Sequence, residues 1–577
     1  MLSQITQKKI KSKLYDIYQT TSSKNYINSY YEEISQLIKR FNKKNRSKKI
    51  RISEKTTMVI CYGDSLYSKS QKFSINNIQK FYNKRLNNYF DTIHFLPFYP
   101  SSSDSGFAVK DHYKIDKRIG NWSNIKKISK SSNIMADIVI NHSSARGLWF
   151  KNFLKGKRPG KDYFLKVNNK FDISKVIRPR DHKLLKKINI FNKNEFLWRT
   201  FSPDQLDLNY KNPAVLIRFI KIMINLINNG VNIFRLDAIA YLWKESGTKC
   251  INLKKTHEII KLIRIICNSL KIQTLIVTET NLPEQENLSY FGKNDEANLI
   301  YNFSLPPLLI QAFLFENSSY LNKWSKKLLK TKLGNCYLNF IASHDGIGIR
   351  PTEGIFNDKT LKNFLTRLKK NGSKFSYRKI NKNKKKVYEA NITVFDALKI
   401  TDFDKIGKFS LERYISAHAI MISLDGVPAI YFNSLFGTSN DEAKFVITGN
   451  NRDINRYKWN MENIFRKLKN KESKERVFYD KMTKLLDIRK KQKAFHPNAP
   501  RFNIKNSAKI YAFKRVSLDK KQTIICITNL SSKKQISQLS GKYKGWKNLI
   551  GPKIKSINKK FFELAPHETV WISNVYN

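Results

Sequence analysis

Short apolar runs recur along the chain from Thr57 onwards, and segments long enough for helices separate most of them. The runs are TMVICYG (57–63), TIHFLPF (92–98), IMADIVINH (134–142), VNIFRLDA (231–238), TLIVTET (274–280), LIYNF (299–303), YLNFIASHD (337–345) and VPAIYFN (427–433). Strands that are buried on both faces of a parallel sheet have this nearly continuous apolar character. Eight such runs alternating with helical segments predict an α/β fold, a (β/α)8 TIM barrel.

Two connections between these runs are too long for a simple strand–helix–strand unit. About ninety residues separate the third and fourth runs, and about eighty separate the seventh and eighth. We therefore expect two inserted subdomains on the same face of the barrel, residues 143–205 after the third strand and residues 346–400 after the seventh. The barrel itself is then expected over residues 57–142 and 206–495.

The two ends of the chain follow different patterns. Residues 1–56 are charged and carry apolar residues at helical spacing, which predicts an N-terminal helical extension and a linker. Near the other end, KIYAFKRVS (509–517), QTIICITNL (522–530) and ETVWISN (568–574) alternate apolar and polar residues. This alternation predicts a small antiparallel β domain over residues 496–577.

The chain is strongly basic, with 108 Lys and Arg residues against 45 Asp and Glu residues and a formal net charge of +63. One interpretation is a protein that binds nucleic acid or an anionic membrane surface. The other is a general enrichment in Lys, Asn and Ile, as an AT-rich genome would encode. We favour the second because the basic residues are spread along the whole chain and no zinc-finger, RNP or basic-region pattern accompanies them.

The five cysteines are scattered and form no CxxC pair. They predict neither a disulfide framework nor a zinc site, and they favour a reducing compartment, for which we expect the cytoplasm. The first residues lack the apolar segment of a signal peptide, and no apolar stretch of about 18 residues predicts a membrane span. The sequence leaves open whether the protein is a monomer or a homodimer.

Polar residues stand near the carboxyl ends of four of the predicted strands, where barrel enzymes carry their active sites. They are Asp137, Asn141 and His142 on the third, Arg235 and Asp237 on the fourth, Glu279 on the fifth, and His344 and Asp345 on the seventh. One such residue alone is more often a cap or a hydrogen-bond anchor. Four strands, however, bring these side chains to one mouth, and carboxylates that meet there suit cleavage of a glycosidic bond, which needs a nucleophile and a protonated general acid.

The pair Arg235 and Asp237 occupies an otherwise mostly apolar run. Residues two apart on a strand point to the same side, so Arg235 can orient the Asp237 carboxylate and keep it ionised through charge-assisted hydrogen bonds. The sequence thus gives a physical reason for two charges in a strand that is expected to be buried.

The segments DIVINH (137–142), FRLDA (234–238), TET (278–280) and ASHD (342–345) together resemble the four core motifs of the α-amylase-type glycoside hydrolases, family 13. Further segments are similar to the sucrose phosphorylase branch: PFYPSSSDSGFAVKDHYKID (97–116), KESGT (244–248), YNFSLPPLL (301–309), HDGIGIRPTEG (344–354) and NNRDINR (450–456). The resemblance covers roughly residues 57 to 577. It implies transfer of a glucosyl unit to phosphate with retention of configuration.

The resemblance also implies residue roles. Asp237 is the expected nucleophile, Glu279 the general acid/base and Asp345 the group that stabilises the transition state, with Arg235 orienting Asp237. The glucose unit is expected to bind Asp104, Phe107, His142, His344 and Arg452. No metal or cofactor is implied beyond inorganic phosphate as cosubstrate.

The acceptor is expected from two loops. TNLPEQENLSYFGKNDEA (280–297) and VYEANIT (387–393), which holds Tyr388 and Glu389, resemble glucosylglycerate phosphorylases more than sucrose phosphorylases. The segment RPR offers Arg178 and Arg180 for an acidic acceptor such as glycerate, unless it is an exposed loop, and with Lys385 these are the candidates for phosphate. Sucrose, sucrose 6'-phosphate and glucosylglycerol remain alternative substrates, as does a glucosidase or transglucosylase activity on the same fold.

Overall fold

The computed structural model describes residues 2–190, 192–380, 385–539, 545–551, 556–558 and 561–575. Its centre is a closed barrel of eight parallel strands in the order β1-β17-β13-β12-β11-β10-β4-β3. The strands are β1 (Met58–Cys61), β3 (Thr92–Phe95), β4 (Asn133–Val139), β10 (Ile233–Asp237), β11 (Leu275–Thr278), β12 (Leu299–Tyr301), β13 (Cys336–Asn339) and β17 (Val427–Tyr431). Each lies within one of the eight apolar runs or begins one residue before it, so the predicted (β/α)8 barrel is confirmed.

Helices surround the barrel because each has one apolar face to bury. They include α3 (Ser74–Phe81), α4 (Trp122–Ile128), α6 (Pro213–Asn228), α7 (Lys254–Ser269), α9 (Leu305–Leu314), α10 (Ser319–Lys327), α13 (Ser410–Ser423), α15 (Met461–Lys469) and α16 (Lys474–Arg489). The start of α6 is encoded locally, since the Asn212 side chain accepts a hydrogen bond from the N–H of Ala214 and Pro213 occupies the first turn.

The register of two neighbouring barrel strands sets up the chemistry. β10 pairs in parallel with β4, and Arg235 stands directly opposite Asp137 while Asp237 stands opposite Val139. Side chains of paired residues in register point to the same side of the sheet. The carboxylate of Asp137 is thereby placed beside the Arg235 guanidinium.

The first long connection folds into strands and one helix above the mouth of the barrel. Its elements are β5 (His142–Ser144), α5 (Leu148–Leu154), β6 (Lys166–Val167), β7 (Leu185–Ile190), β8 (Lys193–Trp198) and β9 (Gln205–Asp207). A small apolar cluster of its own includes Leu165, Leu184 and Trp198. This compact core explains how a segment outside the barrel holds a fixed shape.

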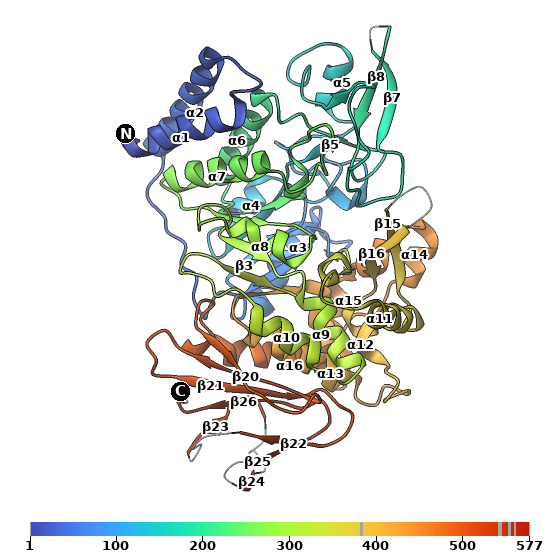
Figure 1. Cartoon of the computed structure of the whole chain (residues 1–577). Coiled ribbons are helices and arrows are strands. Elements are labelled where there is room, and N and C mark those ends of the chain that lie inside the picture. The colour runs from blue at the N-terminus through green and yellow to red at the C-terminus, as the bar shows by residue number, and fades with distance from the viewer. Residues whose placement is uncertain are drawn as a thin grey trace.

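The second long connection also lies at the mouth (Figure 1). It contains β14 (Ile347–Gly348), α11 (Asp358–Lys370), β15 (Lys374–Lys379), β16 (Lys385–Asn391) and α12 (Val394–Lys399). β14 and β16 pair antiparallel, with Gly348 opposite Glu389. The pairing carries Glu389 towards the barrel axis.

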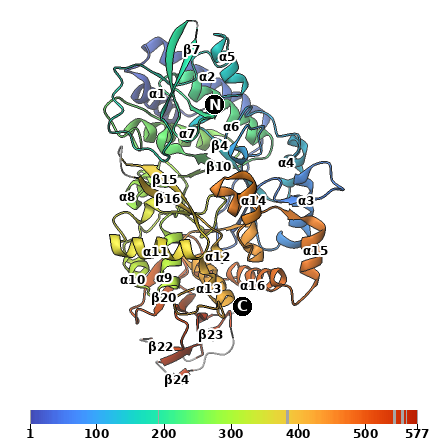
Figure 2. The ribbon, with the colours of Figure 1, turned by 90° about the vertical axis from the view of Figure 1, so that its right-hand side faces the viewer.

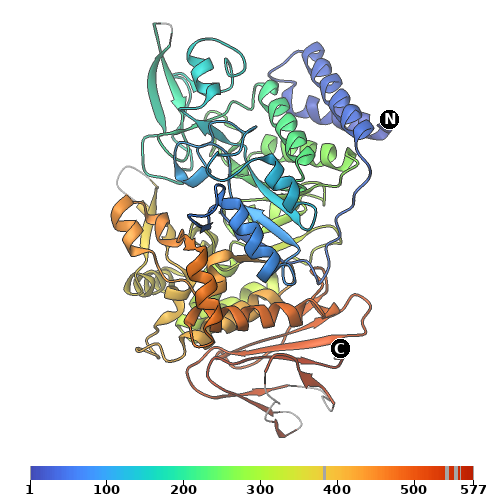
Figure 3. The same cartoon turned by 180° about the vertical axis from the view of Figure 1, so that it is seen from behind.

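The N-terminal extension is a pair of helices, α1 (Gln4–Tyr18) and α2 (Lys24–Lys44), which lie beside α6 and α7 (Figures 1 and 3). Ile10, Leu14 and Ile17 belong to the same continuous apolar core as the barrel. Lys13 Nζ also donates to Glu258 on α7 at 2.5 Å. The extension is thus packed onto the outer helices of the barrel.

The C-terminal segment forms two antiparallel sheets at the end of the molecule opposite to the N-terminal helices (Figure 2). One contains β19 (Arg501–Asn503), β20 (Ile510–Val516), β21 (Thr523–Asn529), β26 (Thr569–Ser573) and β23 (Lys547–Asn548), and the other contains β22 (Gln535–Gln538), β25 (Phe561–Leu564) and β24 (Ser556–Asn558). Buried Arg515 ties the larger sheet to the barrel by donating to the Ser423 carbonyl at 2.6 Å. The predicted antiparallel β domain is confirmed.

Candidate active site

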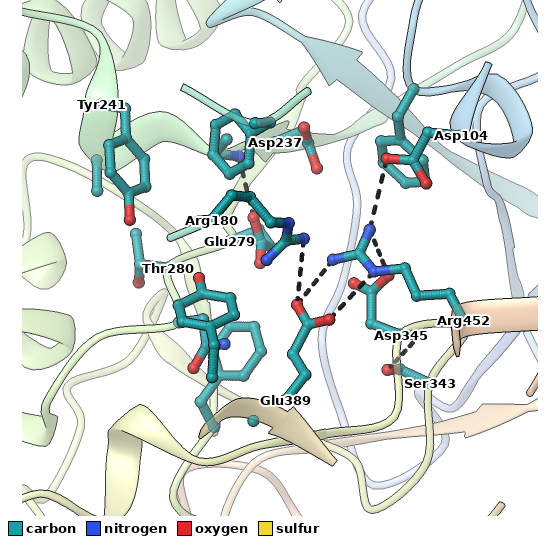
Figure 4. Close-up of a pocket in the computed structure, with 18 of the residues that line it drawn as sticks. Asp104, Arg180, Asp237, Tyr241, Glu279, Thr280, Ser343, Asp345, Glu389 and Arg452 are labelled. Atoms are coloured by element: carbon teal, nitrogen blue, oxygen red, sulfur yellow. Dashed lines mark hydrogen bonds and ion pairs between the residues drawn. The ribbon is translucent and has the colours of Figure 1, made fainter. Parts of the chain in front are cut away.

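One cavity at the carboxyl ends of the barrel strands gathers most of the residues singled out from the sequence (Figure 4). Its lining includes Asp104, Phe107, His142, Arg180, Asp237, Glu279, Asp345, Tyr388, Glu389 and Arg452. Asp237 ends β10, Glu279 follows β11 directly, and Asp345 lies in the loop after β13. Three barrel strands and both inserted segments thus contribute to a single site.

Arg235 is buried behind this cavity and holds two carboxylates. Its Nη1 donates to Asp237 Oδ1 at 2.7 Å and also contacts Asp137 Oδ1. Burying a charge without a partner destabilises the folded state by several kcal/mol, as an order of magnitude. The two charges in the apolar run VNIFRLDA therefore satisfy each other, with Asp137 completing the group.

A buried histidine extends this network on the other side. His94 on β3 lies with Nε2 2.8 Å from Asp137 Oδ2. Burial lowers the pKa of His94 although Asp137 opposes the shift. A neutral imidazole then donates Nε2–H to Asp137, so the chain of contacts runs from His94 through Asp137 and Arg235 to Asp237.

Glu279 faces the cavity next to Asp237. Its Oε2 accepts the N–H of Ala238 at 3.0 Å, and its Oε1 lies 3.9 Å from Arg235 Nη2. Ala238 itself is in the left-handed region, with φ of 50°, an uncommon conformation for a residue with a Cβ. The turn that follows Asp237 thus presents a backbone donor to the neighbouring carboxyl group.

Both carboxyl groups bind protons more readily than free side chains do. Burial raises the pKa of Glu279, and Asp345 adds to the rise against the opposing effects of Arg235 and the Ala238 N–H. Burial also raises the pKa of Asp237, since Arg235 only partly offsets it and Glu279 carries a like charge. Two neighbouring carboxyls titrate as a pair, and such a pair holds one proton more tightly than separated carboxyls would.

A second cluster of charges forms the far wall of the site. Arg452 Nη1 lies 3.0 Å from Asp345 Oδ1 and 3.5 Å from Asp104 Oδ2. Arg456 Nη2 lies 3.4 Å from both Asp104 Oδ1 and Asp345 Oδ1. Burial opposes the ionisation of Asp104, but Arg452 and Arg456 outweigh it and hold the pKa of Asp104 below its usual range. The wall therefore presents fixed acceptors suited to sugar hydroxyls.

The two histidines of the site have lowered pKa values, which favours their neutral forms. Burial lowers the pKa of His142, and burial together with nearby arginines lowers the pKa of His344 further. His142 lines the cavity and donates Nε2–H to the Phe107 carbonyl at 3.1 Å. His344 is buried and stacks on the Phe107 ring, with centroids 5.1 Å apart. These rings build the apolar side of the same space.

On the side facing the inserted segments, Glu389 is held by two arginines. Arg452 donates Nη2–H to Oε1 at 2.7 Å and Nε–H to Oε2 at 3.1 Å, while Arg180 Nη2 lies 3.5 Å from Oε1. The Arg180 guanidinium also lies over the Tyr388 ring at 5.1 Å. Figure 4 shows Arg180 and Arg452 converging on Glu389 from opposite directions.

Two basic residues expected at the acceptor lie elsewhere. Arg178 does not line the cavity, and it is only half-buried in the first inserted segment. Lys385 is more than half exposed and pairs with Asp181 at 2.8 Å. Of the three candidates for an acidic acceptor or phosphate, only Arg180 lines the cavity.

Several site residues were not singled out from the sequence. Phe201, Gln205 and Tyr241 line the cavity, while Arg456 and His94 support it from behind. The polar His94 inside the apolar run TIHFLPF was a signal, and Arg456 stands in the quoted segment NNRDINR. Phe201, Gln205 and Tyr241 follow no such pattern, since their place depends on how the first insertion and the turn after β10 fold.

Within the described residues, no group of three or more His, Cys, Asp or Glu side chains is arranged to hold a metal ion. The expectation that catalysis needs no cofactor stays a prediction. No helix in the described part of the chain combines the length and the apolar character required to span a bilayer.

Comparison with known proteins agrees with this geometry. Residues 82–351 match the family described as "Alpha amylase, catalytic domain". A glucosylglycerate phosphorylase of Spirochaeta thermophila is 37% identical over 82% of this chain and 80% of that protein. Another, from Allomeiothermus silvanus, is 35% identical over 90% of this chain and 91% of that protein. The crystal structure of sucrose 6F-phosphate phosphorylase from Thermoanaerobacter thermosaccharolyticum shares the fold, with a TM-score of 0.71, 23% identity, and coverage of 82% of this chain and 94% of that one.

The closed parallel barrel and the carboxylates at its mouth define an α-amylase-type enzyme. The chain belongs to glycoside hydrolase family 13 and, within that family, to the branch that contains the glucosylglycerate and sucrose phosphorylases.

Proposed function

We propose that the protein is a retaining phosphorylase that transfers a glucosyl unit from 2-O-α-glucosylglycerate to inorganic phosphate and forms α-glucose 1-phosphate. The observation that carries the proposal is the convergence of Asp237, Glu279 and Asp345 on one cavity whose opposite side holds Arg180 and Glu389. Three relatives named glucosylglycerate phosphorylases, 35–38% identical to this chain, support the choice of glucoside.

In the first step, a carboxylate oxygen of Asp237 attacks the anomeric carbon of the glucosyl unit. The bond from that carbon to the glycerate oxygen breaks, and Glu279 gives its proton to the departing oxygen. The product is a β-glucosyl ester on Asp237 and free glycerate. Asp345 accepts hydrogen bonds from sugar hydroxyls while positive charge develops at the anomeric carbon.

The two carboxyl groups divide these roles through their contacts. Asp237 accepts a direct hydrogen bond from the Arg235 guanidinium at 2.7 Å, whereas Glu279 lies 3.9 Å from the same group. The closer cation favours the charged form at Asp237. The proton that the pair holds is therefore assigned to Glu279, which makes Asp237 the nucleophile and Glu279 the acid.

In the second step, a phosphate oxygen attacks the same carbon from the side that glycerate has left. The ester bond to Asp237 breaks, and Glu279, now a carboxylate, takes the proton that phosphate loses. Two inversions at one carbon restore the α configuration. Phosphate and glycerate occupy the same space in turn. Arg180, one of two arginines in the cavity lining, comes from the first insertion and is placed to receive either anion.

The glucosyl unit fits the wall opposite the acceptor. Asp104 and Arg452 present charged hydrogen-bonding groups at the closed end, and Phe107 and His142 form the flank. The Arg452–Asp104 contact of 3.5 Å closes the site at the non-reducing end of the sugar. A site closed there accepts a single glucose residue, and it limits the entry of water to the glucosyl ester.

The test is a phosphorolysis panel with purified protein, using glucosylglycerate, sucrose, sucrose 6'-phosphate and glucosylglycerol, each with and without phosphate. We expect glucose 1-phosphate from glucosylglycerate with the highest kcat/KM. A higher kcat/KM for another glucoside would make that glucoside the substrate and would replace glycerate as the acceptor. Release of free glucose at the same rate without phosphate would instead make the protein a hydrolase and end the proposal.

A further inference from the structure

Three arginines from the two inserted segments act on the acceptor side of the cavity. The first insertion contributes Arg180, and the second contributes Arg350 and Arg378. Burial raises the pKa of the Tyr241 phenol, and the charges of Arg350, Arg180 and Arg378 oppose that rise. Several cations at this point are not needed for binding glucose, which is neutral.

Arg350 is the most exceptional of these residues. Its side chain is only 3% exposed, and Nε and Nη1 find no hydrogen-bond partner among the described residues. The nearest carboxylate is that of Glu353, 3.9 Å from Nε. A buried guanidinium normally has its donors paired, because a buried charge without a partner destabilises the folded state.

Glu353 does not neutralise Arg350 alone, because it also serves Arg378. Arg378 Nη2 contacts Glu353 Oε1 directly, and Arg378 is buried as well. Two buried arginines thus share one carboxylate that is 37% exposed to solvent. Net positive charge remains at this position.

The backbone places Arg350 directly beside the acceptor side. Gly348, two residues earlier, lines the cavity, and the N–H of Ile349 donates to the Tyr388 carbonyl at 3.0 Å. Tyr388 and Tyr241 line the cavity, and the charge of Arg350 opposes the rise in their pKa values that burial causes. The Tyr241 hydroxyl is buried and has no partner among the described residues either. Arg350 is not itself a lining residue, so its charge acts from behind Gly348, Tyr241 and Tyr388.

We propose that Arg350 is a specificity-determining residue that completes an oxyanion subsite on the acceptor side, which favours acceptors with a carboxylate or phosphate over neutral polyols. An anion on this wall supplies the charge that Arg350 lacks in the free protein. Glycerate and phosphate are the two sources of that anion, and both occupy the acceptor space in turn. This inference rests on the proposed function and names the charge that the acceptor must carry.

The test runs the reaction backwards, with saturating glucose 1-phosphate and either glycerate or glycerol as acceptor. The two acceptors differ only in the carboxylate, and the donor is common to both. In Arg350→Met we expect kcat/KM for glycerate to fall at least tenfold relative to kcat/KM for glycerol. An unchanged ratio between the two acceptors, together with an unchanged KM for phosphate, overturns the proposal.

Matched variants separate the local charge from net charge and from misfolding. Lys362→Met removes one cation from an exposed position on α11 of the same insertion and is expected to leave the ratio as in the unmodified protein. If Arg350→Met and Lys362→Met changed the ratio of kcat/KM values equally, the effect would come from overall charge. Glu353→Gln, a change at a partly exposed position, frees positive charge and is expected to lower KM for glycerate. No decrease in KM there contradicts the inference even where Arg350→Met does not fold.

The phosphate arm distinguishes the two anions. Phosphorolysis of glucosylglycerol, a neutral glucoside, gives KM for phosphate in Arg350→Met. An increase in KM for phosphate assigns the subsite to both anions. An unchanged KM for phosphate, together with loss of the preference for glycerate, assigns the subsite to the carboxylate alone. Lack of any glycerate reaction in the unmodified protein would instead reject the proposed function and leave the phosphate arm to test Arg350.

Discussion

Arg452 donates two parallel hydrogen bonds to Glu389, from Nη2 to Oε1 at 2.7 Å and from Nε to Oε2 at 3.1 Å. The third nitrogen of the same guanidinium lies 3.0 Å from Asp345. One side chain therefore couples a carboxylate on the glucose side to a carboxylate on the acceptor side. Only the planar fork of arginine can hold both at once.

Arg452→Lys should keep the charge and lose this geometry. Charge-assisted hydrogen bonds contribute about 1.5–3 kcal/mol each, so loss of one predicts a decrease in kcat/KM of about 10- to 150-fold. Steady-state phosphorolysis of glucosylglycerate measures it. Arg476→Lys, a change in the partly exposed pair with Asp480 on α16, is the control and should leave kinetics unchanged. Equal kinetics for both variants would show that charge alone suffices at Arg452.

Asp237→Asn should abolish the formation of glucose 1-phosphate. The amide cannot form the glucosyl ester, and a loss of at least about a thousandfold is expected for a missing nucleophile. Asp519→Asn, in an exposed turn of the C-terminal segment, controls for an amide elsewhere. Near-normal turnover in Asp237→Asn would remove this residue from the nucleophile role, and denaturation monitored by circular dichroism would exclude simple unfolding.

The acid role of Glu279 predicts a pH dependence with a definite sign. Burial raises the pKa of Glu279, so the proton is kept to higher pH than on a free glutamate. The rate with glucosylglycerate should decrease as pH rises through that raised pKa, because the departing oxygen needs the proton. Glu279→Gln should lose this reaction yet still react with α-glucosyl fluoride, whose leaving group needs no acid.

The control for Glu279→Gln compares this variant on two glucosyl donors, glucosylglycerate and α-glucosyl fluoride. The unmodified protein should show a basic decline in kcat/KM with glucosylglycerate and a weaker one with α-glucosyl fluoride. If Glu279→Gln were equally impaired with both donors, Glu279 would act in binding or folding and not as the acid. Release of fluoride reports the first step separately, and glucose 1-phosphate reports completion of the second.

The sequence predicted the barrel and its carboxylates because both obey strong local constraints. A strand buried on two faces must be nearly all apolar, so charges such as Arg235 and Asp237 stand out within it. The break between α1 and α2 was not predicted, although Ser23 is a local signal for it, since its hydroxyl accepts the Tyr26 N–H at the start of α2. Residues near the acceptor were harder to place because long loops, not strands, position them.

The contrast between Arg178 and Arg180 illustrates this difficulty. Both belong to one short segment, yet only Arg180 lines the cavity. Arg350 stands in the quoted segment HDGIGIRPTEG, but nothing in its neighbours reveals that it is buried with unpaired donors. Pairing between distant segments decides both cases, as when Gly348 meets Glu389 across β14 and β16. Such pairing cannot be deduced from local periodicity.

Buried neutral histidines predict that the protein loses stability in mild acid. Burial lowers the pKa of His418 on α13 to about 4, whereas an unfolded chain has a histidine pKa of about 6.5. The unfolded state therefore binds the proton first, and the stabilising contribution, complete above the unfolded pKa, is lost as pH falls towards the folded one. Linkage gives a loss of about 1.4 kcal/mol for this residue between pH 7.5 and 5.5. Urea unfolding at these two pH values measures it, and His418→Gln should reduce the difference by that amount. His496→Gln, at a half-buried site, should reduce it less, and an equal reduction in both variants would show that burial of His418 is not the cause.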